Sequence, residues 1–161
     1  MEAIPLCKNL ISEEAFWKKI AKLNNMDPSK IPKNLWREGY ENLTEVNRDV
    51  VFLIKKLKKK YKMAIVSNSI KFHEKINKKR GILDLFDVVI MSHKVALTKD
   101  AKDIFLLAAR KLKVKPSESI FIDDVKDFVK VAESAGMNGV VFKNAAQLRA
   151  DLEKTLNRKI I

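Results

Sequence analysis

The sequence has 161 residues, which is enough for one domain with a buried core, or for one domain with a small appendage. Its 47% hydrophobic and 33% charged residues, with only four Gly and four Pro, exclude a disordered chain, a collagen-like repeat and a linker-rich protein. The net charge of +13 leaves two interpretations open, a solvated lysine-rich surface or a polyanion-binding surface around the basic run Lys55–Lys62.

Cysteine usage and hydropathy suggest a compartment. Cys7 is the single cysteine, so no disulfide within the chain is possible, and a reducing environment is expected. The first residues contain no sustained apolar stretch typical of a secretory signal, and no segment approaches the length of a membrane span. We therefore expect a cytoplasmic protein without a membrane partner.

The first fifty residues predict helices. Ser12 precedes two glutamates, which is typical of a helix start, and Phe16, Ile20 and Leu23 then recur on one helical face. Further helical periodicity covers residues 32–42 and 47–60. We expect helical hairpins in this part of the chain.

After Lys62 the pattern changes to alternating strands and helices. The continuous apolar run at the start of MAIVSNS, residues 63–69, is typical of a strand buried on both faces. Further strands are predicted at 88–91, 119–122 and 139–142, and helices at 70–79, 100–112, 125–135 and 144–156. This alternation predicts an α/β fold, a parallel sheet with helices on both faces.

Polar residues follow three of the predicted strands. Ser67 and Asn68 end the first strand, Lys99 lies in the loop after the second, and Asp123 and Asp124 end the third. Ligand sites of open α/β sheets lie beyond the carboxyl ends of the strands. Two adjacent carboxylates are favourable there if they bind Mg²⁺, and a lysine with a hydroxyl suits a phosphate. Taken singly, the serine, asparagine and aspartates could instead cap the helices that follow.

The order of these residues resembles the haloacid dehalogenase (HAD) superfamily of hydrolases, in particular the subgroup with a small helical cap, over residues 12–157. The resemblance implies that Ser67, with Asn68 beside it, binds the transferring phosphoryl group of a phosphorylated small molecule. It implies that Lys99 neutralises nucleophile and phosphate, and that Asp123 and Asp124 hold Mg²⁺. It also divides the chain into a helical cap-like region, residues 1–46, and a HAD-like core, residues 47–161.

The sequence departs from the family's pattern in its nucleophile. The first family motif, Asp-X-Asp-X-Thr on a central strand, supplies the attacking carboxylate and occurs nowhere in this chain. In addition, Asp100 follows Lys99 where the family usually has proline, and Phe128 stands where relatives often have Asn or Asp. We therefore expect a phosphatase-type chain that is weakly active or inactive alone, a possible pseudoenzyme. The alternative is a non-catalytic module that binds an anion, a nucleic acid or a protein.

Without the first strand, its two neighbours would have unpaired edges. Three solutions are open: residues Ala3–Leu10 substitute in part, the flanking strands move together, or another chain supplies a strand and forms an oligomer. Pro5 makes the first solution imperfect, because a central strand needs every backbone donor.

The remaining aromatic and histidine residues predict no site of their own. His73 and His93 lack metal-ligand spacing, and we expect both to be surface residues or to lie behind the site. Trp17, Trp36 and Tyr40 are expected to pack the helical region rather than to form a ligand cage.

Overall fold

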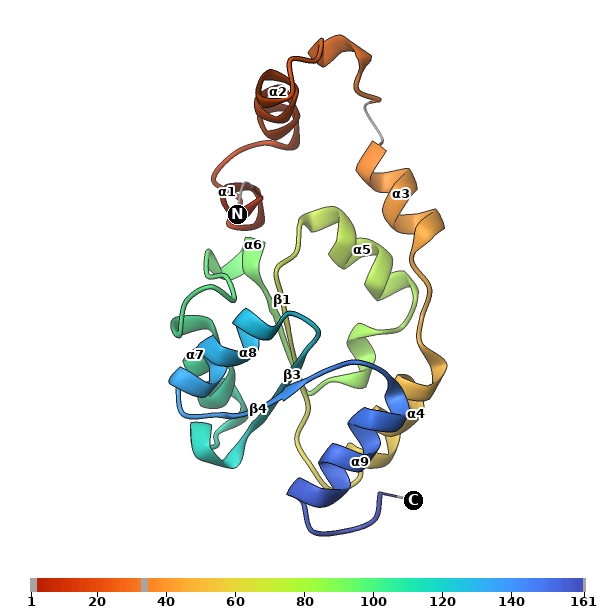
Figure 1. Ribbon diagram of the computed structural model, residues 1–161, viewed down its shortest axis with the longest axis vertical. Coiled ribbons are helices and arrows are strands. Elements are labelled where there is room, and N and C mark those ends of the chain that lie inside the picture. The colour runs from red at the N-terminus through yellow and green to blue at the C-terminus, as the bar shows by residue number, and fades with distance from the viewer. Residues whose placement is uncertain (1–2, 33–34, 161) are drawn as a thin grey trace.

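The computed structural model describes residues 3–32 and 35–160, and Figure 1 shows an α/β region below a smaller helical region. The helices are α1 (Ile4–Cys7), α2 (Glu13–Leu23), α3 (Leu35–Leu43), α4 (Arg48–Leu57), α5 (Lys71–Lys79), α6 (Ser92–Val95), α7 (Asp103–Leu112), α8 (Lys126–Ser134) and α9 (Ala145–Thr155). The strands are β1 (Ala64–Ser67), β2 (Val88–Met91), β3 (Ile120–Asp123) and β4 (Asn138–Val141). Among the described residues, no helix is long and apolar enough to cross a membrane.

Helices α2, α4 and α9 begin at side chains that cap them. Ser12 accepts a hydrogen bond from the Ala15 amide at the start of α2, and Asn47 accepts one from the Val50 amide at the start of α4. Gly136 ends the turn after α8 with φ of +92°, a conformation that a residue with a Cβ rarely adopts. The predicted strands and helices after residue 62 are thus confirmed to within a few residues, and the short helix α6 was not predicted.

The strands form two separate parallel pairs. β1 pairs with β2 in the register Ala64 to Val88, and β3 pairs with β4 in the register Ile120 to Asn138. The prediction of parallel strands is therefore confirmed. They do not form one continuous sheet, however, because β1 and β3 are not hydrogen-bonded to each other.

Two of the three solutions for the unpaired edges are wrong. Residues 4–7, within the segment proposed as a substitute strand, form helix α1, whose second residue is Pro5, a position that needs no backbone donor. The two flanking strands also have not moved together into a pair. The described residues therefore leave an edge of β1 and an edge of β3 without a strand.

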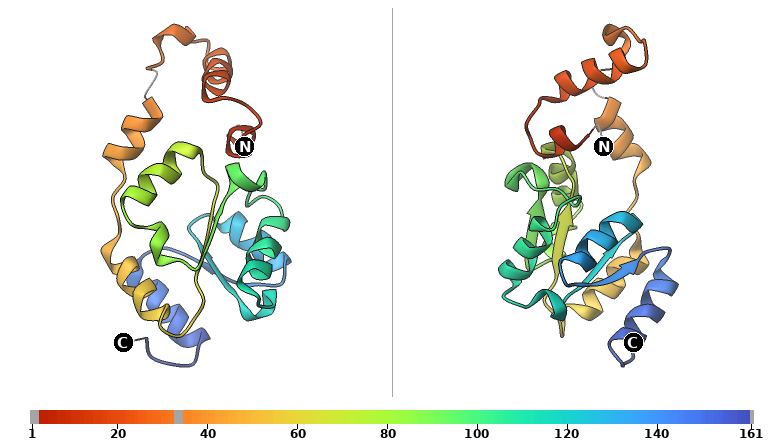
Figure 2. Two further views of the ribbon diagram at one scale, coloured as in Figure 1. Left: turned by 180° about the vertical axis from the view of Figure 1, so that it is seen from behind. Right: turned by 60° about the vertical axis from the view of Figure 1, so that its left-hand side comes forward.

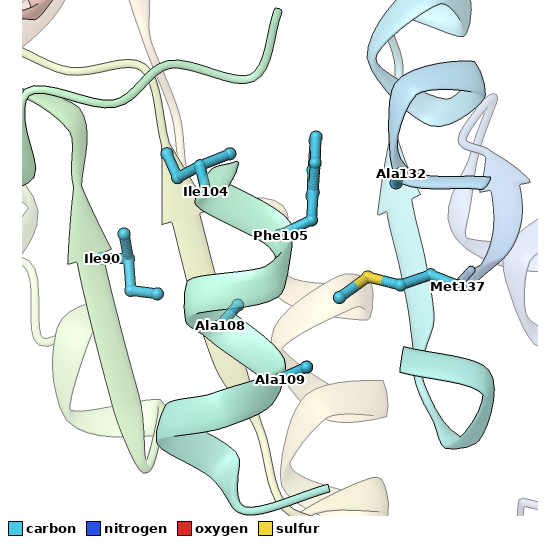
Figure 3. Packing of buried hydrophobic residues seen from close by; sticks show 7 residues of the cluster. All are labelled: Ile90, Ile104, Phe105, Ala108, Ala109, Ala132 and Met137. Carbon is cyan, nitrogen blue, oxygen red and sulfur yellow. The ribbon is translucent and has the colours of Figure 1, made fainter. Parts of the chain in front are cut away.

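Helix α7 holds the two strand pairs together on one face. Its residues Ile104 and Phe105 are fully buried and share a core cluster with Ile90 of β2 and Met137, which precedes β4. Figure 3 shows α7 in front of the sheets, with Phe105 and Met137 reaching between them. The Phe105 ring meets Phe121 of β3 edge to face, with 4.7 Å between centroids.

The opposite face is covered by α4 and α9. Leu53 of α4 is buried in a second cluster with Val140 of β4 and with Leu148 and Leu152 of α9. The views in Figure 2 show α9 beside α4, at the end of the molecule remote from α2. The strand pairs are therefore sandwiched between α7 and α8 on one side and α4 and α9 on the other.

The helical region rests on the carboxyl-end side of the sheets through aromatic side chains. Phe16 stacks on Trp36 with centroids 5.0 Å apart, and Trp17 meets both rings edge to face. Trp36 and Tyr40 of α3 contact His73 of α5, and the Tyr40 ring stacks on it at 3.9 Å. These aromatic residues pack against one another, as the sequence predicted.

Candidate functional site

The polar residues predicted to converge lie at the carboxyl ends of β1 and β3. The backbone amide of Lys99 donates to the Asn68 side-chain oxygen at 2.9 Å, which ties the Lys99 loop to the end of β1. The Lys99 ammonium donates to Asp123 Oδ2 at 2.6 Å, which ties the same loop to the end of β3. Lys99 thus bridges the two strand pairs.

The ion pair is well shielded from solvent. The side chain of Lys99 is 13% exposed and that of Asp123 is 8% exposed. The Phe128 ring covers the ammonium, with its centroid 4.8 Å from Nζ. Asp100, which follows Lys99 where the family usually has proline, accepts a hydrogen bond from the Thr98 hydroxyl. The two residues that depart from the family pattern therefore both have contacts, Asp100 with Thr98 and Phe128 with Lys99. Lys99 itself pairs with Asp123.

The two aspartates differ in whether their carboxylate oxygens already accept hydrogen bonds. Asp123 Oδ1 accepts from the backbone amide of Val125 at 2.9 Å, so both of its oxygens are engaged. Asp124 is exposed, and no described residue binds its carboxylate. The half-buried Ser67 hydroxyl likewise has no partner among the described residues. Asp124 and Ser67 are therefore the groups most available to a ligand.

Ser92 and His93 hold the loop after β1. The sequence analysis did not name Ser92, and it left open whether His93 lies at the surface or behind the site. The buried Ser92 hydroxyl accepts from the Ser69 amide at 2.8 Å and donates to the Ser69 carbonyl at 3.1 Å. His93 Nδ1 lies 3.0 Å from the same carbonyl. His93 is only 8% exposed. Of the two positions expected for it, the one at the surface is therefore wrong, and the one behind the site is confirmed. These contacts fix the backbone that carries Ser67 and Asn68.

His93 is held between two acceptors. Its Nε2 lies 3.0 Å from Glu74 Oε2, while its Nδ1 faces the Ser69 carbonyl. The ring thereby links the loop after β1 to helix α5. Burial raises the pKa of Glu74, but the hydrogen bond and charge of Lys94 and those of His93 outweigh it and lower that pKa. The only sign of Ser92 and His93 in the sequence was their position directly after β2.

The aspartates suit Mg²⁺ in donor type. Mg²⁺ is commonly bound by one or two carboxylates, with water and substrate phosphate completing its coordination. Asp123 and Asp124 could supply such oxygens, although Asp123 would have to exchange a present hydrogen bond for the ion. The described residues contain no group of three or more His, Cys, Asp or Glu side chains that could hold a metal by themselves.

Two cavities of about 210 Å³ each lie away from the strand ends. One is lined by Tyr40, Thr44, Val50, Asn77 and Arg80, among others, between the α3–α4 connection and α5. The other is lined mainly by basic residues, namely Lys56, Lys59, Lys60, Arg158 and Lys159, with Leu57, Tyr61 and Ile160.

The fold agrees with the family that the sequence matches. Residues 1–142 match the family described as haloacid dehalogenase-like hydrolases, so the chain belongs to this family. The predicted fold and the predicted superfamily are thereby confirmed.

Solved structures of the family share the fold. A predicted HAD-like family hydrolase from Porphyromonas gingivalis superposes with a TM-score of 0.74 at 21% identity, covering 98% of this chain and 80% of that one. A wild-type HAD family enzyme from Bacteroides thetaiotaomicron, in complex with magnesium and inorganic phosphate, superposes with a TM-score of 0.70 at 22% identity. That match covers 88% of this chain and 74% of the enzyme.

Curated relatives match over shorter segments. The fructose-1-phosphate phosphatase YqaB of Escherichia coli is 33% identical over 60 residues, which cover 37% of this chain and 32% of that protein. Mouse bifunctional epoxide hydrolase 2 is 35% identical over 69 residues, which cover 43% of this chain and 12% of that protein. The matched segments therefore span less than a third of either relative.

Proposed function

We propose that this chain provides the phosphate- and magnesium-binding edge of a HAD-type phosphohydrolase. The observation that carries the proposal is the bridge made by Lys99, which brings the ends of β1 and β3 together. The bound magnesium and phosphate of the Bacteroides thetaiotaomicron enzyme support the same ligands for this chain.

Each residue would have a separate task. The free Ser67 hydroxyl and the Asn68 amide would donate hydrogen bonds to phosphoryl oxygens, and the Lys99 ammonium would balance their negative charge. Asp123 and Asp124 would hold Mg²⁺, which when bound supplies a Lewis acid that polarises the phosphoryl group. Ser92 and His93 would keep Ser67 and Asn68 in place through Ser69.

By itself the chain would turn over little substrate. The sequence has no Asp-X-Asp-X-Thr motif, so the covalent path through an attacking aspartate is closed, and only positioning and charge stabilisation remain. The expected substrate class is a phosphorylated small molecule.

Binding of inorganic phosphate, measured by calorimetry with and without Mg²⁺, tests the proposal. We expect Mg²⁺-dependent binding that Lys99→Met and Asp124→Asn each weaken by about tenfold or more, since a hydrogen bond to a charged group contributes about 1.5–3 kcal/mol. Lys130→Met and Asp127→Asn are matched controls, because these residues form an exposed ion pair on α8. Equal binding by all four variants would contradict the proposal.

Hydrolysis of a generic aryl phosphate with and without Mg²⁺ tests the predicted low activity. We expect a rate close to that of the buffer for the wild type and for Asp124→Ala. Mg²⁺-dependent turnover that Asp124→Ala abolishes would show that an attacking group completes the site, and the chain would then be an active phosphatase.

The basic cavity favours a second candidate, a polyanion-binding module. Five cations from the end of α4, the residues after it and the C-terminal segment line the cavity, and no acidic residue does. This candidate predicts binding of single-stranded RNA that weakens steeply with added salt and with Lys59→Ala, Lys60→Ala and Arg158→Ala combined. Binding of phosphate that depends on Lys99 and Asp124 distinguishes the first candidate.

A further inference from the structure

The basic cavity at the end of α4 gathers cations without acids. Its volume is about 210 Å³, and it is lined by Leu57, Tyr61 and Ile160 together with five basic residues, namely Lys56, Lys59, Lys60, Arg158 and Lys159. None of the described residues that line it is acidic. Like charges that face one cavity repel each other, so the arrangement favours an anion between them.

The cations of the cavity differ from a neighbour in the same basic run. Lys58 has a counter-charge, because its Nζ lies 3.5 Å from Asp87 Oδ1. The five cations that line the cavity, in contrast, form no ion pair with a described residue. The Lys56 ammonium lies 5.1 Å from the centroid of the Phe52 ring, a contact that supplies no negative charge. The charge of the cavity is therefore uncompensated by the described residues.

The carboxyl ends of helices explain only part of this charge. Cations in the last turn of a helix are favourable by themselves, because they interact with the helix dipole, and the effect falls off beyond that turn. In α4 this accounts for Lys56, which lies in the last turn. The other four cations follow α4 or α9 rather than lie within them, so their gathering at one cavity needs another reason.

Specific contacts fold residues 157–160, which we call the strap, back toward α4, as Figure 1 shows below α9. Asn157 has φ of 47°, a left-handed conformation, and the Arg158 amide donates to the Glu153 carbonyl at 3.1 Å, which together reverse the chain after α9. The Ile160 amide donates to Glu153 Oε1 at 3.0 Å, and the Ile160 side chain packs on the core cluster of α4 and α9. Arg158 and Lys159 are thereby held at the cavity.

We propose that the basic cavity binds a compact anion with adjacent phosphate groups, either a free polyphosphate or the phosphate tail of a nucleotide. The lysines supply point charges, Arg158 supplies a planar fork for two phosphate oxygens, and the Tyr61 hydroxyl can donate a hydrogen bond. The volume of about 210 Å³ is below the roughly 300–1,000 Å³ of sites for drug-sized ligands, which favours a compact anion over a long chain.

This site is separate from the candidate phosphate site at the strand ends. Tyr61 precedes β1, whereas Ser67 ends it, so the two sites lie at opposite ends of the same strand. In Figure 1, α4 and α9 lie at the end of the molecule opposite to α2. The proposal names a ligand class for the cavity on which the second candidate function rests, and it does not depend on the first candidate.

Calorimetric titration with inorganic tripolyphosphate in the absence of Mg²⁺ tests the proposal. We expect Lys60→Met and Arg158→Met each to weaken binding by about tenfold, since each removes a hydrogen bond between charged groups. Lys55→Met is the matched control and should change binding little, because Lys55 belongs to the same basic run but does not line the cavity. Lys99→Met distinguishes the two sites, because it should weaken binding of phosphate with Mg²⁺ at the strand ends and not binding of tripolyphosphate here.

Two substitutions of Glu153 separate the role of the strap from that of net charge. Glu153→Ala removes the acceptor that holds the Ile160 amide, and it also removes a negative charge. We expect it to weaken tripolyphosphate binding, because the strap is released, whereas charge alone predicts tighter binding. Glu153→Gln keeps an acceptor without the charge, so this variant should bind at least as tightly as the wild type.

Amide chemical shifts measured by NMR locate the ligand on the wild-type protein, so this measurement does not depend on how the variants fold. We expect tripolyphosphate to shift the amides of Lys60, Tyr61 and Lys159 and to leave that of Lys99 unchanged. ATP distinguishes the two sources of such a ligand. Tighter binding of tripolyphosphate assigns the cavity to a free polyphosphate, and tighter binding of ATP assigns it to a nucleotide.

Three results would overturn the proposal. The first is the absence of tripolyphosphate binding, or shifts confined to the strand ends, and this includes the case in which the protein binds single-stranded RNA alone. The second is an equal loss of affinity in Lys55→Met and Lys60→Met, which would indicate diffuse attraction to a basic surface. The third is tighter binding by Glu153→Ala. None of these results depends on Mg²⁺ or Asp124, so failure here is distinct from failure of the proposed phosphohydrolase edge.

Discussion

The α/β region and the helical region differ in what holds them together. In the α/β region, α7 contributes fully buried side chains that contact both strand pairs. The helical region, α1 to α3, contacts the rest through a smaller cluster in which Phe16 and Leu6 are buried and both tryptophans remain half-exposed. Local opening follows the extent of buried apolar contact, so the helical region should open at a lower free energy than the α/β region.

The largest effect should come from removing the side chain that joins the two strand pairs. Phe105→Ala is expected to lower the free energy of unfolding by about 3–5 kcal/mol, because the fully buried ring leaves a cavity between α7 and Phe121. Leu106→Ala is the matched control, since Leu106 is 43% exposed on the same helix. Urea unfolding measures both, and equal losses would refute the central role of Phe105.

A smaller and local effect is expected in the helical region. Trp36→Ala removes ring contacts with Phe16 and Trp17, which contribute about 0.5–1.5 kcal/mol each beyond the area they bury. Proteolysis should then cut the segment from α2 to α3 faster, while global unfolding changes little. Leu43→Ala on α3 is the control, because Leu43 is 84% exposed. A loss of global stability as large as that of Phe105→Ala would contradict the comparison.

Loss of a helix cap should affect only the helical region. Ser12→Ala removes the hydrogen bond to the Ala15 amide and should destabilise α2 by about 1 kcal/mol. Exchange of the first amides of α2 measures this loss, and the amides of α7 serve as an internal reference. Ser12→Asn should restore the cap, so failure of that rescue would argue against capping.

The smallest effect should be a pH dependence of the contact between α3 and α5. Burial, and then the charge of His93, lower the pKa of His73 below its ordinary value of 6.5, and its buried Nε2 has no hydrogen-bond partner among the residues that the structure describes. The unfolded or undocked state therefore binds a proton more readily, so this contact loses stability as the pH falls below 6.5. Glu74 stays ionised in this range, because its pKa lies below 4.5.

Thermal unfolding between pH 7.5 and 5.5 measures this dependence. His73→Phe keeps a ring beside Tyr40 and removes the titrating group, so its unfolding midpoint should fall less on acidification than that of the wild type. An identical pH dependence in the two proteins would show that another group is responsible.

The sequence by itself determined the local elements and the residues of the candidate site. Apolar runs located the strands β1 to β4 of the described residues, because a strand buried on both faces needs continuous apolar side chains, and the capping residue Ser12 located the start of α2. The sequence predicted that the polar residues after the strands converge, and Lys99 does bridge the ends of β1 and β3, because parallel strands bring their carboxyl ends to one edge.

Only the tertiary structure decided how these elements combine. The sequence analysis left open that residues 3–10 form a strand. This segment instead contains a helix that starts with Ile4 and Pro5 and packs against α6. The engagement of Asp123 Oδ2 and the position of His93 depend on partners far away in the chain, Lys99 and Glu74. The separation of β1 from β3 is likewise a property of long-range pairing, which no local propensity specifies.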